Sequence, residues 1–405
     1  MELSFPEIVL TIGLLLMLVA GLSGLARGTV LSISLVAVAA GMLLNSVGIT
    51  DIGPRDPAII AAIELALIFT LFSDGQIVER ELLVGHVGPT ARALVLALPA
   101  TVGLIAVMAK LLFSELGWDE ALLLGAVLAP TDPVITSAVV GARAVPAKLR
   151  HVLNLESGLN DGLALPFVLV FIAIGVGEGG AGEEAGKLIG EAFVGAILGY
   201  LLAYAGGRAI EDLPGVRLTP KYEGIYALGI ALAAFGLAES TIGNGFIAVF
   251  VAGVSLAIAD RESPKAFHDF NESIGAILQT VTFFIFGGLV IDAGVPSPAV
   301  AALALVLWVL LVARPAAIMA ALAGSDLEPL QRRFLAWFGP KGVASMLFAL
   351  FVLKSGVPGA ELIFQLASLI ILASIVAHGL TDTIGARWIE RRLEAQGGEE
   401  ESAPA

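Results

Sequence analysis

The chain has 405 residues, of which 58% are hydrophobic and only 14% are charged, whereas soluble domains carry about 25% charged residues. This composition predicts an integral membrane protein without a separate soluble domain. The formal net charge of −14 argues against nucleic acid as a partner, and the absence of cysteine excludes disulfides, thiolate metal sites and cysteine nucleophiles.

Apolar segments of about 20 residues, the length of a spanning helix, recur along the whole chain. Residues 1–28 are predicted to be the first span rather than a removable signal, because their leading edge is acidic and they lack a convincing small-residue cleavage site. The sequence therefore predicts an all-α membrane protein with about 13 transmembrane helices. Their centres lie near Leu14, Val38, Leu65, Val102, Ala126, Pro166, Ala196, Leu228, Val251, Phe284, Val309, Ala344 and Ile370.

The charges of the predicted loops alternate along the chain. One set of loops holds sixteen Lys and Arg residues, whereas the other set holds only Arg55, Lys110, Lys187 and Lys354. Because Lys and Arg are retained on the cytoplasmic side, the N-terminus is predicted to be external and the C-terminus cytoplasmic, in the plasma (inner) membrane. Residues 391–405 are predicted to form a short acidic cytoplasmic tail, disordered from Glu394 onward.

Two predicted spans are interrupted by helix-breaking residues. Residues 130–133 (PTDP) interrupt the fifth span and residues 339–342 (GPKG) interrupt the twelfth. If the seventh span links two inverted six-helix repeats, the breaks occupy corresponding places, as in many secondary transporters. A proline kink without function would explain either break alone, but a matched pair with a charge at each break indicates a transporter binding site near the bilayer midplane.

Charged and polar residues cluster in four of the predicted spans. A charge near a helix centre costs about 2.5 to 3.5 kcal/mol on insertion scales, so a cluster implies partners and a function. The stretch 156–161 (ESGLND) contains two pairs of residues four positions apart, and it presents adjoining rows of oxygen ligands on one broad helix face. The cluster consists of Asp132 in the fifth span, Glu156, Asn160 and Asp161 in the sixth, Arg314 in the eleventh and Lys341 in the twelfth.

Unwinding of the fifth span would free carbonyl oxygens around Thr131, beside the carboxylate of Asp132. Together with Ser157 and Asp161, these atoms would form a small anionic cage of oxygen ligands, which alkali cations prefer. Such a cage should hold Na⁺ or protons but not both together, and competition for one site is enough to couple the two ions. The residues therefore predict exchange of a monovalent cation for protons.

Two motifs resemble those of a known family. The TDP tripeptide at 131–133 and the E-S-x-x-N-D pattern at 156–161 are similar to the motifs of NhaP-type Na⁺/H⁺ antiporters, the prokaryotic relatives of animal Na⁺/H⁺ exchangers, and the resemblance covers essentially the whole chain. It implies that electrogenic relatives carry a second aspartate where this chain has Asn160, which marks electroneutral exchange of one cation for one proton. It also implies Na⁺ contacts from the Thr131 carbonyl, Asp132, Ser157 and Asp161.

The same resemblance implies supporting roles for four residues. Arg314 matches the arginine that family members place opposite Glu156, and an unpaired buried charge on either residue would be very costly. Lys341 stands where relatives often carry arginine, which disfavours a bidentate role and favours simple neutralisation of the broken helix ends. Asp74 resembles an acidic position along the ion path, although a loop-facing aspartate would explain it equally well.

The site residues also suggest how the chain is organised. We expect residues 1–390 to form a single transporter domain, in which a core bundle (spans 4–6 and 11–13) moves against a dimerisation scaffold (spans 1–3 and 7–10) of a homodimer. This motion would expose the site alternately to each side of the lipid bilayer.

Other classes of function are compatible with parts of the sequence. The chain has no Walker loop, dinucleotide fingerprint or metal-ligand spacing, so we expect a secondary transporter that needs no cofactor and is not an enzyme. The alternatives are a K⁺/H⁺ antiporter on the same scaffold, a cation channel, and an intramembrane hydrolase that uses Asp132 and Asp161. Single histidines in or beside the predicted loops could sense pH, with the best prospect at His151.

Overall fold

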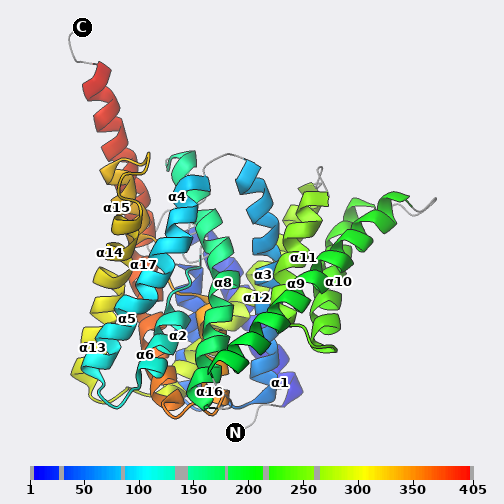
Figure 1. Cartoon of the computed structure of the whole chain (residues 1–405), viewed down its shortest axis with the longest axis horizontal. Helices are drawn as coiled ribbons and strands as arrows, with labels where there is room; N and C mark the ends of the chain where they lie inside the picture. Colours follow the sequence, from blue (N-terminus) through cyan, green and yellow to red (C-terminus); the bar gives the residue numbers. More distant parts are fainter. Residues whose placement is uncertain are drawn as a thin grey trace.

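The computed structural model describes residues 4–26, 32–83, 87–132, 145–177, 181–212, 219–259 and 265–401. Every regular element within these ranges is helical (Figure 1), which confirms the predicted all-α class. The first half of the chain contains α1 (Phe5–Ala26), α2 (Ile33–Ser46), α3 (Pro57–Leu83), α4 (Val87–Arg92), the π-helical turn η1 (Ala93–Ala97), α5 (Leu98–Leu112), α6 (Trp118–Leu128) and α8 (Ala147–Val176). The second half contains α9 (Ala181–Asp212), α10 (Pro220–Glu239), α11 (Gly245–Ala259), α12 (Lys265–Ala293), α13 (Ala299–Trp308), the π-helical turn η2 (Val309–Ala313), α14 (Arg314–Ala321), α15 (Pro329–Trp337), α16 (Val343–Lys354) and α17 (Ala360–Glu401).

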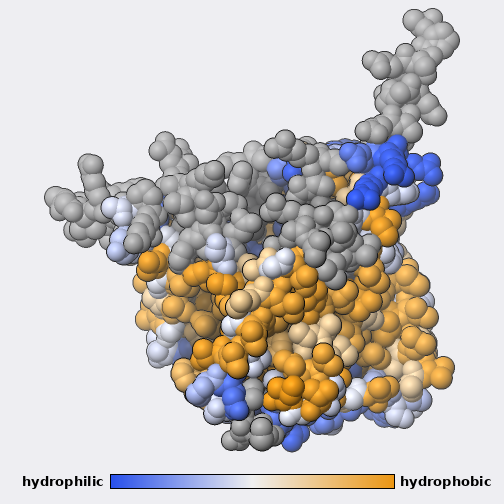
Figure 2. All heavy atoms as spheres, turned by 180° about the vertical axis from the view of Figure 1, so that it is seen from behind, coloured by the Kyte–Doolittle hydropathy of each residue, from blue (hydrophilic) through white to orange (hydrophobic). Residues whose placement is uncertain are grey.

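The helices have the length and composition of a multi-spanning membrane protein. Within the described residues, eight helices are long and apolar enough to cross a bilayer, and three shorter apolar helices accompany them. All thirteen predicted span centres fall within helical segments, but the count of thirteen crossings stays a prediction. On the face shown in Figure 2, hydrophobic side chains cover a broad continuous band with hydrophilic residues beyond its edges.

Two π-helical turns occupy matching places in the predicted fourth and eleventh spans. Each turn has five residues and is followed one residue later by a proline, Pro99 after η1 and Pro315 after η2. Proline has no N–H to donate to the carbonyl four residues earlier, and this missing bond favours the wider turn. This correspondence, like that of the two helix breaks, fits an inverted repeat.

Both predicted helix breaks are present in the structure. α6 ends at Leu128 and the chain continues without helix to Asp132, while residues 338–342 separate α15 from α16. The rest of the predicted fifth span, including Pro133, lies outside the described residues. In the described part, both breaks leave the backbone groups of a buried segment without helical partners.

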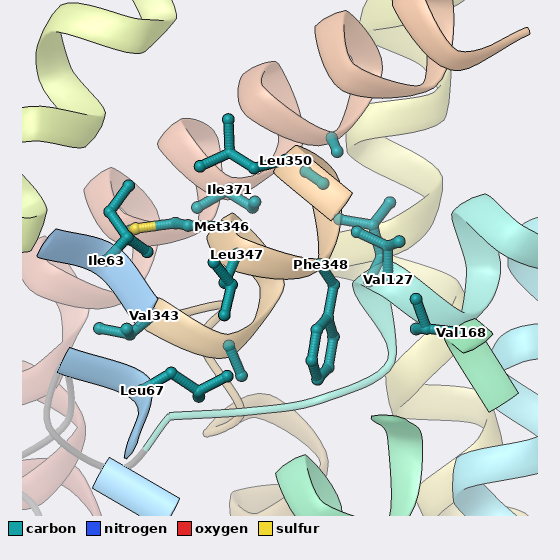
Figure 3. Close-up of a cluster of buried hydrophobic side chains, with 14 of the residues drawn as sticks. Ile63, Leu67, Val127, Val168, Val343, Met346, Leu347, Phe348, Leu350 and Ile371 are labelled. Atoms are coloured by element: carbon teal, nitrogen blue, oxygen red, sulfur yellow. The ribbon is translucent and has the colours of Figure 1, made fainter. Parts of the chain in front are cut away.

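α16 lies at the centre of the bundle. Its residues 343–350 are all buried, which explains why a helix of only twelve residues is apolar on every side. Figure 3 shows its side chains packed against Ile63 and Leu67 of α3, Val127 of α6, Val168 of α8 and Ile371 of α17. This packing fixes the start of α16, and therefore the second break, deep inside the protein.

A close crossing of α3 and α11 positions the part of α3 that carries Asp74. A side chain at Gly75 would collide with the backbone of α11, and one at Gly253 would collide with the backbone of α3 at Phe72. Small residues allow helices to approach closely in membranes. Asp74 is therefore held at a helix crossing rather than in a loop.

The C-terminal tail differs from its prediction. α17 continues as one helix to Glu401, so the segment expected to be disordered from Glu394 is helical up to that residue. Residues 391–396 are Arg, Arg, Leu, Glu, Ala and Gln, all good helix formers that extend the preceding turns. Figure 1 shows this end of α17 projecting from the bundle.

Candidate functional site

The two broken spans meet directly at their breaks. The N–H of Asp132 donates to the carbonyl of Pro340 at 2.8 Å. In the opposite direction, the Lys341 ammonium donates to the carbonyls of Ala129 and Pro130 at 3.3 and 3.2 Å. Each break therefore satisfies backbone groups that the other leaves free, which is how non-helical backbone is tolerated at membrane depth.

Asp132 lies at the N-terminus of α16. Its Oδ2 accepts a hydrogen bond from the N–H of Val343 at 3.3 Å. The residue before, Gly342, approaches so closely that a Cβ there would overlap the Asp132 carboxylate. Free N–H groups and the helix dipole make this end of α16 a place that attracts negatively charged groups.

Lys341 lies at the C-terminal end of α6. Its side chain is only 1% exposed and contacts the carbonyls just beyond the last residue of α6. The C-terminus of a helix carries partial negative charge, which attracts a cation. Neutralisation of the broken helix end by Lys341 stays a prediction, and a single ammonium group would be sufficient for it.

The polar face of α8 adjoins the break in the fifth span. Asn160 donates from Nδ2 to the Thr131 hydroxyl at 2.6 Å, and that hydroxyl lies 3.3 Å from the Ser157 hydroxyl. Asp161 is buried on the same helix, and its Oδ1 has no hydrogen-bond partner within the described residues. Thr131 thus contacts α8 through its hydroxyl, whereas the ion contact expected from its carbonyl stays a prediction.

Glu156 and Arg314 form the buried ion pair that the sequence predicts. The guanidinium donates to both carboxylate oxygens, from Nη1 at 2.7 Å and from Nη2 at 3.1 Å. Nη2 also reaches the carbonyl of Phe338 at 3.5 Å, and a Cβ on Gly339 would overlap the guanidinium. Arg314 therefore ties α14 and α8 to the end of α15 with a bidentate geometry.

Asp74 belongs to the same group of charges. It is buried within α3, at 6% exposure. The alternative prediction, that Asp74 faces a loop, is therefore wrong. It interacts electrostatically with Asp132 and Asp161, and Asp161 in turn interacts with Lys341. Three carboxylates and one ammonium group thus share a buried region where water screens them little.

Two residues of α17 at this site escaped prediction. Ser374 accepts the N–H of Lys341 on its hydroxyl oxygen at 2.9 Å, and His378 bonds through Nε2 to the carbonyl of Trp337 at 2.9 Å. The sequence does contain a pattern that could have identified them. A serine and a histidine lie four residues apart inside an apolar span, and this spacing places them on one helix face.

A helical membrane bundle in which broken helices cross beside buried charges is typical of secondary transporters. The chain belongs to the sodium/hydrogen exchanger family, whose transmembrane model matches residues 12–387.

Among its relatives, the chain is 25% identical over 376 residues to the K(+)/H(+) antiporter NhaP of Alkalimonas amylolytica, covering 92% of this chain and 65% of that protein. It is 26% identical over 291 residues to the K(+)/H(+) antiporter NhaP2 of Shewanella sp. (strain ANA-3), covering 71% of this chain and 50% of that protein. The chain therefore spans about half to two thirds of the length of these curated relatives.

The fold is similar to a solved structure of the sodium proton antiporter MjNhaP1 from Methanocaldococcus jannaschii at pH 8. The TM-score is 0.77 with 19% sequence identity, and the alignment covers 95% of this chain and 100% of that chain. This likeness establishes a common fold for the membrane bundle.

Proposed function

We propose that the protein is a secondary antiporter that exchanges Na⁺ (or Li⁺) for H⁺ at a site formed by Thr131, Asp132, Ser157 and Asp161. The observation that carries this proposal is that two buried side-chain oxygen atoms on α8 lack a hydrogen-bond partner among the described residues. These atoms are Oδ1 of Asp161 and Oδ1 of Asn160. Buried polar atoms are ordinarily satisfied, so these oxygens are free to receive a transported cation or, at Asp161, a proton.

The surrounding chemistry suits a hard cation as the substrate. Carboxylate, hydroxyl and amide oxygens gather where α6, α8 and α16 meet, and alkali ions prefer oxygen ligands. If all three carboxyl groups were ionised, their negative charge would exceed the single positive charge of Lys341. A bound cation or a bound proton would relieve this excess, so the two ions compete for the same place.

The exchange is one cation for one proton. Asn160 carries a neutral amide that donates to Thr131, and an amide does not take up a proton in the transport cycle. The Glu156 carboxylate is held by both terminal nitrogens of Arg314 and serves as a structural anchor. Asp132 and Asp161 are then the residues at which one cation and one proton replace each other. Because both ions carry a single positive charge, the exchange moves no net charge across the membrane.

Alternating access would come from movement of the core bundle against the scaffold of a homodimer. Contacts within the predicted core join α5 to α6, α6 to α8 and α16 to α17, while contacts within the predicted scaffold join α2 to α12 and α9 to α11. In Figure 1, α9, α10 and α11 lie together, apart from α5, α13 and α14. The charge distribution of the loops supports an external N-terminus and a cytoplasmic C-terminus.

A K⁺/H⁺ antiporter is the second candidate. The names of two relatives, both K(+)/H(+) antiporters, favour it specifically. Both candidates use the same carboxylates and differ only in which alkali ion fits the cage.

The test is proton efflux from acid-loaded proteoliposomes on addition of Na⁺, K⁺ or Li⁺. We expect wild-type efflux with at least one cation, and its loss in Asp132→Ala, Asp161→Ala and Asp161→Asn. Glu115→Gln, a carboxyl-to-amide change on the exposed turn between α5 and α6, is the matched control and should retain exchange. Undiminished exchange in either Asp161 variant would overturn the proposal, and the order of the three cations decides between the candidates.

A further inference from the structure

One face of α17 changes from apolar to cationic toward the C-terminal end of the helix. Leu380, Ile384 and Trp388 follow one another at intervals of four residues and are 42%, 58% and 41% exposed. Residues four positions apart lie on one helix face, so these three side chains form a single outward stripe. The proposed ion exchange at the aspartates makes no use of this stripe.

Two arginines continue the stripe beyond the indole. Arg391 and Arg392 are three and four residues past Trp388, within about 60° of it around the helix axis, and both are exposed. Neither guanidinium has an ion-pair partner within the described residues. Glu390 is half-buried and, two residues from Trp388, lies on the opposite side of α17. The stripe therefore ends in two positive charges beside an indole.

The packing of α15 places this turn of α17 at the edge of the apolar band. Nε1 of Trp337, the last residue of α15, donates to the Thr381 hydroxyl at 3.1 Å. Ile389 is fully buried in the cluster against which Leu330, near the start of α15, also packs. α15 thus lies beside α17 between these two levels, and the residues that precede it, Glu328 among them, are largely exposed. Figure 2 shows hydrophilic residues gathered where the projecting C-terminal helix leaves the hydrophobic band.

We propose that Trp388, Arg391 and Arg392 form a binding site for the headgroup of an anionic phospholipid. Guanidinium groups donate in pairs to phosphate oxygens, and an indole at the boundary of a bilayer lies at the level of the headgroups. Basic residues directly beyond a spanning helix attract anionic lipids. Leu380 and Ile384, deeper in the band, contact the acyl chains of the same lipid.

The chemistry of the stripe favours a lipid over a soluble anion. A free phosphate would use the two guanidinium groups alone and would leave the exposed side chains of Leu380 and Ile384 without a partner. An anionic phospholipid matches both parts, because its charge and its chains are joined in the same order as the arginines and the apolar residues. A zwitterionic headgroup matches them less well, since its own cation offsets the phosphate.

The first experiment measures contact between the lipid and Trp388. The full-length protein in detergent is titrated with phosphatidylglycerol that carries bromine on its acyl chains, because bromine quenches the fluorescence of an indole that it contacts. The emission that Trp388→Phe removes should be quenched at lower concentrations of brominated phosphatidylglycerol than of brominated phosphatidylcholine. Equal quenching by the two lipids would overturn selectivity for an anionic headgroup.

The second experiment removes the two charges. The double variant Arg391→Gln/Arg392→Gln should raise the phosphatidylglycerol concentration needed for half-maximal quenching by about tenfold or more and leave the phosphatidylcholine titration unchanged. The matched control is Arg55→Gln/Lys354→Gln, which removes two exposed positive charges near the start of α17, where Arg55 pairs with Glu361. This control should behave as the wild type. A double arginine variant that keeps the full preference for phosphatidylglycerol would overturn the site.

Inorganic phosphate separates a lipid site from a site for any phosphate. At millimolar concentration it should not reverse the quenching by brominated phosphatidylglycerol more than chloride does at the same ionic strength. Reversal by phosphate alone would assign the arginines to a soluble anion and contradict the proposal. None of these measurements involves transport, so failure of the proposed antiport would leave their outcome unaffected.

Discussion

Oδ2 of Asp132 accepts the N–H of Val343, so the carboxylate of one broken helix caps the first turn of the other. The same contact joins the two predicted inverted repeats at corresponding points. In the proposed mechanism, Asp132 both caps α16 and takes part in ion exchange. Asp132 therefore has two roles, as a hydrogen-bond acceptor and as a charged group, and substitutions can distinguish them.

Asp132→Asn tests those two roles. The amide oxygen can still accept the N–H of Val343, so we expect the variant to fold and to melt close to the wild-type temperature in detergent. It cannot carry the charge that alternates between cation and proton, so exchange in proteoliposomes should be lost. Asp132→Ala should lose both properties. Retained exchange in Asp132→Asn would show that its charge is not needed.

The ion pair of Glu156 and Arg314 predicts a strongly non-additive double-mutant cycle. Arg314→Met leaves a buried carboxylate without its partner, and removing one member of a buried pair costs about 3 to 5 kcal/mol. Glu156→Leu should be similarly harmful, whereas the double variant should recover much of the lost thermal stability. Melting of all four proteins in detergent measures this coupling. If the double variant were as unstable as the sum of the singles, the pair would not be the reason for their instability.

Substitution of Glu120 is predicted to lower thermal stability without changing cation preference. Its Oε2 accepts the N–H of Gly117 at 2.6 Å and its Oε1 accepts the N–H of Gly359 at 2.7 Å, so one carboxylate caps both α6 and α17. Loss of a cap costs about 0.5 to 2 kcal/mol, and Glu120→Ala removes two. The melting temperature of Glu120→Ala should be well below that of the control Glu115→Ala, because Glu115 is exposed. The cation preference should be unchanged. Equal melting temperatures would mean that the caps contribute nothing measurable.

Asn160 predicts that exchange does not depend on membrane potential. If one cation replaces one proton, clamping proteoliposomes at different potassium diffusion potentials with valinomycin should leave the rate of Na⁺-driven exchange unchanged. In Asn160→Asp the amide that donates to Thr131 is replaced by a carboxylate that can bind a second proton. We expect this variant to become sensitive to potential if it remains active. A strong voltage dependence of the wild type would refute the one-to-one stoichiometry.

The sequence predicted the features that depend on local composition. Apolar runs located the helices, and proline and glycine at 130–133 and 339–342 located both breaks. The resemblance to the antiporter family predicted the partnership of Glu156 with Arg314, and the cost of an unpaired buried charge agrees with it. The helices and the breaks need only neighbouring residues or a general energetic argument.

What the sequence did not predict depends on contacts between distant segments. His378 meets Trp337 across 41 positions of the chain, and no local pattern reveals that both ring nitrogens face carbonyls. The burial of Asp74 depends on the close crossing of α3 and α11 at Gly75 and Gly253. The bonds of the Thr131 hydroxyl likewise require α6 and α8 to be placed side by side.

The most direct test of the central claim is the apparent KM for the transported cation as a function of pH. In the proposed mechanism one site holds either a cation or a proton, so acidification should raise the apparent KM by up to about tenfold per pH unit and leave the maximal rate unchanged. Asp161→Asn should show no saturable exchange under the same conditions. An apparent KM that is independent of pH across the active range, with protons still moving against the cation, would contradict a single shared site at Asp132 and Asp161.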